Sequence, residues 1–176
     1  MRVVFFSGSG LSADSGIPTF RGRAGLYADI DPVELLSDRT LRRDPGLVHE
    51  FLDGFRESLK GYVPNPAHAM IRRWQQRHAD TVVITMNIDD MLERAGCVDV
   101  VHLHGEVRGL TSVGNPAVQV DIGYHRYWSG DAGREPSAAI KVGDRHYDVS
   151  GYQFRCPVSQ SLFRPDVVLF GELAPR

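Results

Sequence analysis

The stretch Phe6–Gly22, with the sequence FSGSGLSADSGIPTFRG, decides the fold of this chain. It overlaps the apolar run Val3–Phe6, whose β-branched and aromatic residues are typical of a buried strand in a mostly parallel sheet. Gly8 and Gly10 then allow the backbone to approach a ligand, because neither residue has a Cβ atom. Ser12, Asp14 and Ser15 are candidates for capping a helix start, where free N–H groups and the helix dipole favour phosphate. The stretch therefore predicts a nucleotide site at a strand–turn–helix junction.

The second half of this stretch is more specific than the first. It closely resembles the NAD-binding signature of the sirtuins, the NAD-dependent protein lysine deacylases, which reads Gly-Ala-Gly-x-Ser and then Ser-Gly-Ile-Pro-x-Phe-Arg. Within that core only Ser9, which stands for Ala, departs from the family pattern. An ordinary strand–helix turn is the alternative, but three further family motifs follow in the family's order. The resemblance implies these cofactor-binding residues: Gly8, Ser9, Gly10, Ser12, Ile17, Phe20 and Arg21.

The composition indicates a globular chain without a general affinity for polyanions. The 176 residues are 42% hydrophobic, which is enough for one domain with an insert. A formal net charge of −2 predicts no attraction to nucleic acid or to an anionic membrane surface. The early predicted strand leaves no room for a secretory leader, and Cys97 and Cys156 are the only cysteines. We therefore expect a cytoplasmic protein with no nucleic-acid or membrane partner.

A second motif follows the predicted strand Thr81–Thr85. The residues Thr85–Asp89 resemble the sirtuin motif Thr-Gln-Asn-x-Asp, with Met86 in place of Gln. The resemblance implies that Ile88 and Asp89 hold the nicotinamide carboxamide. It also implies that Asn87 orders the nicotinamide ribose and acts in catalysis. Because the Met86 side chain is a poor hydrogen-bonding group, we expect a weaker hold on the ribose.

A third motif, Leu103-His104-Gly105, ends the predicted strand that begins at Val98. It matches the sirtuin Leu-His-Gly, whose His is the general base. A single His at the end of a strand is more often structural, but this one falls at the same sheet edge as the other motifs. The resemblance therefore assigns the general base to His104 and not to His102.

The segment 23–63 is predicted to be helical and loop-like, with apolar residues on one helical face: Leu47, Val48, Phe51, Leu52 and Phe55. In sirtuins this region is the flexible cofactor-binding loop and part of the smaller domain. Sirtuins that remove acidic acyl groups carry Tyr-x-x-Arg in the corresponding helix, and here Leu52 and Phe55 fall at those places. The substitution favours neutral acyl groups. A further helix is expected from Asn65-Pro66 to about His78.

Sirtuins build a zinc ribbon after Leu-His-Gly, with two Cys-x-x-Cys pairs. Counting from the flanking motifs places the four ligand positions at Ser112, Asn115, Cys156 and Ser159. One thiolate is too few for a structural zinc site, so we expect no metal. The segment 112–160 is instead expected to be a β-rich module with three strand-like pieces: Val118–Ile122, Ala139–Val142 and His146–Phe154.

The fourth motif lies at Phe163–Glu172, where we expect the chain to return to the parallel sheet. It resembles the sirtuin Leu-Arg-Pro-x-Val-Val-x-Phe-Gly-Glu almost residue for residue. In the family this segment pairs with the backbone of the substrate peptide, which is a form of strand addition. Val168 and Phe170 would then line the acyl-lysine tunnel. The resemblance implies these substrate-binding residues: Val168, Phe170, Gly171 and Glu172.

The predicted fold is therefore α/β, with a Rossmann-like, mostly parallel sheet that is incomplete at its C-terminal end and carries a small inserted module. Its expected parts are a Rossmann-like domain (1–22, 64–111 and 161–176), a helical module (23–63) and a β-rich insert (112–160). The segments that hold the adenosine half of NAD in sirtuins are not in this sequence. We therefore expect weak NAD binding, and a second copy or a partner that completes the sheet edge.

The expected activity is NAD-dependent deacylation of an acyl-lysine protein or peptide, with transfer of the acyl group to ADP-ribose. Two alternatives stay open from the sequence. One is an NAD glycohydrolase or ADP-ribosyl transferase, which shares the loss of nicotinamide. The other is a catalytically weak module that binds NAD or peptide.

Overall fold

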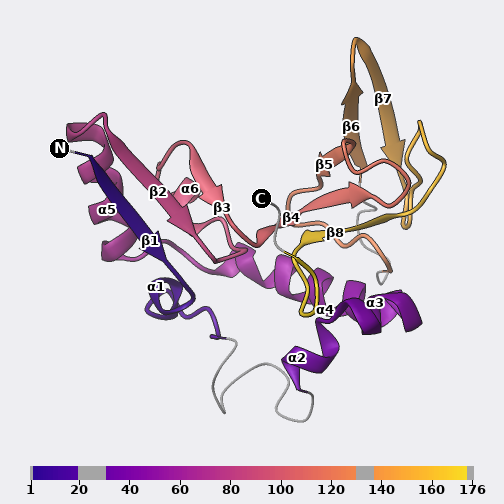
Figure 1. Cartoon of the computed structure of the whole chain (residues 1–176), viewed down its shortest axis with the longest axis horizontal. Helices are drawn as coiled ribbons and strands as arrows, with labels where there is room; N and C mark the ends of the chain where they lie inside the picture. Colours follow the sequence, from indigo (N-terminus) through magenta and orange to yellow (C-terminus); the bar gives the residue numbers. More distant parts are fainter. Residues whose placement is uncertain (1, 20–30, 130–136, 174–176) are drawn as a thin grey trace.

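The computed structural model describes residues 2–19, 31–129 and 137–173. The expectations for Phe20 and Arg21 lie outside these residues. Figure 1 shows a parallel sheet near the N-terminus, a group of helices and a separate antiparallel region. Among the described helices, none is long and apolar enough to cross a membrane.

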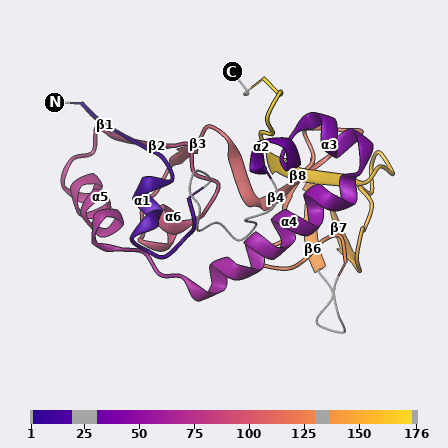
Figure 2. The same ribbon diagram turned by 90° about the horizontal axis from the view of Figure 1, so that it is seen from below.

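A three-stranded parallel sheet forms the expected Rossmann-like part. It has the order β1 (Val3–Ser7), β2 (Thr81–Thr85) and β3 (Val100–His102). Figure 2 shows α1 (Gly10–Ala13), α5 (Pro66–Arg77) and α6 (Met91–Arg94) on one side of this sheet. They bury a small core there: Ile71, Val83, Leu92 and Cys97. On the strands, Val4 and Phe6 remain 54% and 60% exposed, respectively.

A second sheet is antiparallel, with the order β5 (Gln119–Asp121), β4 (Gly105–Ser112) and β8 (Phe163–Val167). The expectation that the fourth motif returns to the parallel sheet is wrong, because β8 pairs with β4. Gly105 permits this change of sheet. Its φ is 75°, and a Cβ atom there would lie 2.0 Å from the carbonyl oxygen of Asp166.

The β-rich character expected of residues 112–160 is seen in β5 and in the hairpin β6 (Ser137–Val142) and β7 (Arg145–Ser150). The third strand is shorter than expected, since it ends at Ser150. Strand β4 was not expected from the sequence. Aromatic and aliphatic side chains from β4 to β8 form one core: Leu110, Val118, Val120, Ile122, Tyr127, Ile140, Phe154, Cys156 and Phe163.

The segment 31–61 is helical, as expected, and each α-helix begins at a side-chain cap. Its elements are α2 (Pro32–Leu35), α3 (Asp38–Arg43), α4 (Pro45–Ser58) and the 3-10 turn η1 (Leu59–Gly61). Helix α4 buries Val48, Leu52 and Phe55, whereas Leu47 in its first turn is exposed. The buried face of α4 packs against Val107 of β4 and Val167 of β8 in the antiparallel sheet. The same core includes Ile88 and Met91, which follow β2.

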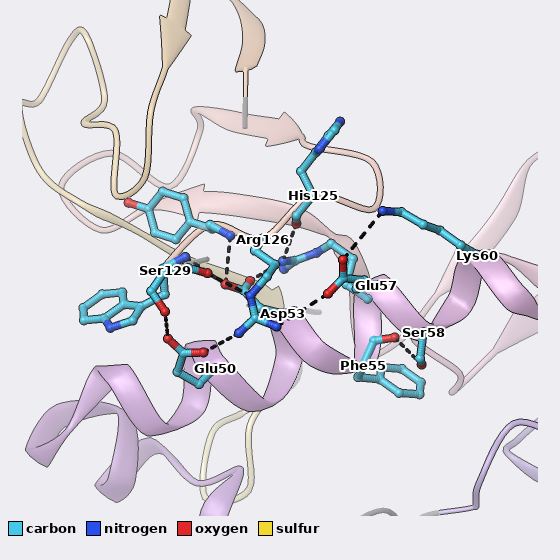
Figure 3. A network of polar contacts seen from close by, with 12 residues as sticks. Glu50, Asp53, Phe55, Glu57, Ser58, Lys60, His125, Arg126 and Ser129 are labelled. Atoms are coloured by element: carbon cyan, nitrogen blue, oxygen red, sulfur yellow. Dashed lines mark hydrogen bonds and ion pairs between the residues drawn. The ribbon is translucent and has the colours of Figure 1, made fainter. Parts of the chain in front are cut away.

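A buried polar network fixes α4 to the insert (Figure 3). The carboxylate of Asp53 accepts hydrogen bonds of 2.8 Å from the backbone N–H groups of both Tyr127 and Trp128. Arg56 donates to the carbonyl oxygen of Val107 at 2.6 Å and to the carboxylate of Asp53 at 2.5 Å. The network therefore satisfies backbone groups of the insert and of β4 from a single helix.

Candidate active site

A cavity of about 530 Å³ lies at the carboxyl ends of β1 and β2, where parallel sheets commonly bind ligands. It brings together described residues from all four sequence motifs: Gly8, Ser9, Ser12, Ile17, Asn87, Ile88, Asp89, His104, Val168, Phe170, Gly171 and Glu172. Gly10 is the one described member of the expected set that does not line it. Other lining residues come from the helical module and from β8: Leu36, Phe55 and Val167.

A larger hollow, of about 670 Å³, lies beside β4 and β8. It is lined by His102, Arg164 and Leu173, among others, and lacks His104 and the glycine loop. We regard the smaller cavity as the candidate site, because it holds the general-base candidate together with the buried polar groups that could bind a ligand.

The glycine loop passes from β1 directly into the one-turn helix α1. Ser9 is the N-cap residue, but its side chain makes no capping hydrogen bond. The expectation that Ser12 caps this helix is wrong, because Ser12 lies within it and is almost fully buried. Its hydroxyl oxygen instead accepts a hydrogen bond of 3.1 Å from the side-chain amide of Asn87. This hydrogen bond is one of several that join the first and second motifs.

The loop after β2 is held by hydrogen bonds within the loop and by one from β4. The N–H of Asn87 donates to the hydroxyl oxygen of Thr85 at 3.0 Å, and the carbonyl oxygen of Ile88 accepts from the N–H of Val107 at 2.9 Å. One carboxylate oxygen of Asp89 accepts from the N–H of Met91 at 3.1 Å. Burial raises the pKa of the Asp89 carboxyl group, and the hydrogen bonds it accepts only partly offset that effect. A buried carboxyl group at the cavity wall is suited to pair with an amide group of a ligand.

His104 reaches this loop from the end of β3. Its Nδ1 atom lies 3.0 Å from the carbonyl oxygen of Met86. A carbonyl oxygen only accepts, so Nδ1 carries a proton and, in the neutral ring, Nε2 is the atom that can accept one. This is the tautomer that a general base requires, on a residue that lines the cavity.

His102 is placed differently, although it lies only two residues earlier. Both of its ring nitrogens contact oxygen atoms within the protein, at the carbonyl of Asn87 and the carboxylate of Glu93. It does not line the cavity. The sequence did not signal this role for His102 or Glu93.

The segment after β8 forms another part of the cavity wall. Its backbone is engaged within the chain: the N–H of Val168 donates to the carbonyl of His104 at 2.9 Å, and the N–H of Phe170 to the carbonyl of Leu36 at 2.8 Å. The Glu172 carboxylate accepts from Arg164, with distances of 2.5 and 2.9 Å, and from the N–H of Leu169. A peptide strand added here would therefore pair through other backbone groups of the segment.

The four positions counted as zinc-ligand positions do meet in space. The hydroxyl groups of Ser112 and Ser159 lie 2.9 Å apart, and both contact the hydroxyl of Ser161. Asn115 joins through its N–H, which donates to the Ser112 hydroxyl at 3.3 Å. Burial opposes ionisation of the Cys156 thiol, but hydrogen bonds from Ser112 and Ser159 lower its pKa overall. One thiolate among hydroxyl groups does not fit a tetrahedral zinc site. In the part of the chain that the structure describes, no group of three His, Cys, Asp or Glu residues is arranged to hold a metal.

Comparison with known proteins shows what this chain is similar to. A family model described as the Sir2 family matches residues 8–176. The NAD-dependent protein deacylase 1 of Pseudomonas aeruginosa is 37% identical over 175 residues, covering 99% of this chain and 64% of the relative. The NAD-dependent protein deacylase of Campylobacter jejuni strain RM1221 is 41% identical over 176 residues, covering 99% and 65%.

Solved structures agree. A Sir2 homologue in complex with NAD matches with a TM-score of 0.73 and 31% identity, covering 98% of this chain and 58% of that one. A mutant Sir2 homologue in complex with ADP-ribose matches with a TM-score of 0.72 and 31% identity, covering 98% and 60%. The chain thus spans less than two thirds of the length of these relatives.

Proposed function

The chain belongs to the Sir2 family, and on that premise we propose that it is an NAD-dependent protein lysine deacylase. One observation carries the proposal. His104, with Nδ1 bonded to the Met86 carbonyl and Nε2 available as a base, lines the same cavity as Asn87 and Asp89. Two further observations support it. The similar proteins are named NAD-dependent protein deacylases, and one similar solved structure is a complex with NAD.

The buried polar groups of the cavity fit the nicotinamide half of NAD. Asp89 can accept from the carboxamide NH₂ of nicotinamide, and the side chain of Asn87 can donate and accept near the ribose. NAD, when bound, supplies the ribose carbon from which nicotinamide leaves and to which the acyl oxygen of the substrate lysine becomes attached. Nε2 of His104 then takes a proton from a ribose hydroxyl group, whose oxygen becomes nucleophilic toward the acyl carbon. No residue of the protein has to serve as a covalent nucleophile.

The acyl group is proposed to be neutral. Phe55, at the place where some relatives carry Arg, lines the cavity together with Leu36, Val167 and Leu169. Leu52, at the place of Tyr, is fully buried in the core instead. Neither side chain can pair with a carboxylate on an acyl chain.

An NAD glycohydrolase or ADP-ribosyl transferase is the second candidate, because it needs only the step that releases nicotinamide. Met86 supports it. This side chain is 40% exposed, lines the cavity and offers the ribose no strong hydrogen bond. A catalytically weak binding module is the third candidate function, and it is supported by the short length of the chain relative to its homologues.

We also propose that the protein acts in the cytoplasm.

Product analysis separates these functions. The protein is incubated with NAD and an acetyl-lysine peptide, and with the unmodified peptide as the control, and the products are identified by mass spectrometry. We expect O-acetyl-ADP-ribose only with the acetylated peptide. Free ADP-ribose with either peptide would establish the glycohydrolase. Unchanged NAD with both peptides would contradict both enzymatic functions.

A further inference from the structure

Two histidines at the end of β3 hold two successive carbonyl groups of the loop after β2. His104 contacts the carbonyl oxygen of Met86 at 3.0 Å, and His102 contacts that of Asn87 at 2.8 Å. His102 is the last residue of β3, and His104 lies two residues beyond it, in the turn before β4. The loop they hold carries the polar groups of the nicotinamide side of the cavity.

His102 differs from His104 at its second nitrogen. Its Nε2 atom lies 2.9 Å from Oε1 of Glu93, which is on α6. A carbonyl oxygen and a carboxylate oxygen both only accept hydrogen bonds, whereas a neutral imidazole has a single N–H. Both contacts are satisfied only if both ring nitrogens carry protons. The ring therefore fits this place as an imidazolium ion.

The surroundings of His102 support the charged form. Its side chain is 5% exposed, and the charged groups that face it are Glu93 on α6, Glu106 on β4 and Asp89 after β2, which are all acidic. Burial alone would lower the pKa of His102. The hydrogen bonds to Glu93 and Asn87 and the nearby negative charges raise it overall.

We propose that His102 is a positioning residue of the active site: as an imidazolium ion paired with Glu93, it fixes the Asn87 carbonyl and so the orientation of Asn87 in the cavity. The N–H, the carbonyl oxygen and the side-chain NH₂ of Asn87 are then all bonded, to Thr85, His102 and Ser12 respectively. A residue with three fixed groups presents its side chain in one orientation. The role in catalysis rests on the proposed function, whereas the charge state of His102 does not.

The charge pair makes a prediction about pH. The charged ring donates to both Asn87 and Glu93, whereas a neutral ring has one N–H and must give up one of these two hydrogen bonds. Because the pKa of His102 is raised in the folded protein, the doubly bonded ring is present at low pH and is lost as the pH rises through that pKa. The substitution Glu93→Gln keeps the size of the side chain but removes the counter-ion, so this loss should occur at lower pH. Glu106→Gln is the matched control, because it removes a neighbouring negative charge that makes no hydrogen bond to the ring.

The charge state is tested by ¹⁵N NMR of the imidazole nitrogens in the wild type and in both variants across neutral and alkaline pH. We expect both ring nitrogens of His102 to be protonated in the wild type at neutral pH, with deprotonation at lower pH in Glu93→Gln than in Glu106→Gln. The side-chain amide signals of Asn87 should shift together with this deprotonation. A neutral His102 ring at neutral pH would overturn the proposal, whether or not the protein shows activity.

The catalytic part is tested by the pH dependence of deacylation. In Glu93→Gln the alkaline limb of the kcat/KM profile should move to lower pH, while the acidic limb stays in place. His102→Gln should lower kcat/KM by about 10- to 100-fold, since small displacements of positioned groups have effects of this size. Unchanged profiles in both variants, with an imidazolium confirmed by NMR, would contradict the positioning role. If neither the wild type nor any variant deacylates the peptide, the proposed function is wrong. The NMR experiment still decides the charge state of His102 in that case.

Discussion

Asp53 and Arg56 form an ion pair, with 2.5 Å between Oδ1 and Nη1, in which both side chains are fully excluded from solvent. The pair is more than a local contact within α4, because each residue also bonds to distant segments of the chain. Asp53 accepts from two N–H groups of the insert, and Arg56 donates to Val107 of β4. Removing either member leaves a buried charge without its partner.

We therefore expect Asp53→Ala to lower the free energy of unfolding by about 3–5 kcal/mol, the usual cost of breaking a buried pair from one side. Denaturant unfolding monitored by circular dichroism measures this change. Asp38→Ala is the control, because its ion pair with Arg42 lies at the surface and should contribute little. Equal effects of the two substitutions would show that the Asp53 network does not stabilise the fold.

His49 lies at a contact between α4 and the insert that we expect to weaken in acid. Its ring stacks on Trp128 at 4.8 Å, and burial, together with the positive charges of Arg56 and Arg164, lowers its pKa to about 3. The unfolded chain takes up this proton below about pH 6.5, whereas the folded protein resists it. The stabilising effect is thus present above the unfolded pKa and is lost as the pH falls toward the folded value.

Between about pH 7.5 and about pH 5, this one group should reduce the free energy of unfolding by about 2 kcal/mol. The variant His49→Phe keeps an aromatic ring against Trp128 but does not titrate. The free energy of unfolding should be measured at both pH values for the wild type and for His49→Phe. Its decrease between these pH values should be smaller in the variant, by about 2 kcal/mol. An identical pH dependence in the two proteins would rule out His49 as the source.

Because the hydroxyl groups of Ser112, Ser159 and Ser161 cluster at the positions counted as zinc ligands, we expect no stoichiometric zinc in the protein. Elemental analysis after purification without chelators should find none. The triple substitution Ser112→Cys, Asn115→Cys and Ser159→Cys should create a zinc site with Cys156, because these positions already meet in space. The same triple variant with Cys156→Ser is the control and should bind zinc more weakly. One zinc per wild-type chain, lost on Cys156→Ala, would contradict this account.

We expect that a substitution at Met86 can increase the affinity for NAD. Its side chain lies at the cavity wall, and its terminal methyl group would be 3.2 Å from a Cβ atom at Gly8. Met86→Gln restores the amide that the family motif carries and should tighten NAD binding, by about 1 kcal/mol for one added hydrogen bond. Calorimetry with NAD measures it, with Met86→Leu as an apolar control. Weaker binding by the Gln variant than by the Leu variant would exclude a ribose contact at this position.

The sequence predicted the parallel sheet and the meeting of the motifs well. Gly8, Asn87 and His104 each follow an apolar run, and the ends of parallel strands share one edge, so local pattern was sufficient to bring them together. The helical module and the β-rich insert followed from hydrophobic spacing and turn residues in the same way.

Long-range pairing could not be predicted in this way. Strand β8 pairs with β4, and Gly105, which has a positive φ, lies against the backbone of Asp166 in this pairing. The hydrophobic pattern of the sequence does not reveal this contact. Ser12 looked like a helix cap, but its hydroxyl is used by Asn87, 75 residues away. His102 and Arg56 likewise depend on partners that come together only in the folded chain.

The central claim is that His104 is the general base of a deacylase. It is tested most directly in His104→Ala, by measuring deacylation of an acetyl-lysine peptide together with exchange of labelled nicotinamide into NAD. Release of nicotinamide precedes the proton transfer, so exchange should continue, while deacylation should fall by about 100-fold or more. Deacylation at a near-normal rate in His104→Ala would contradict the account.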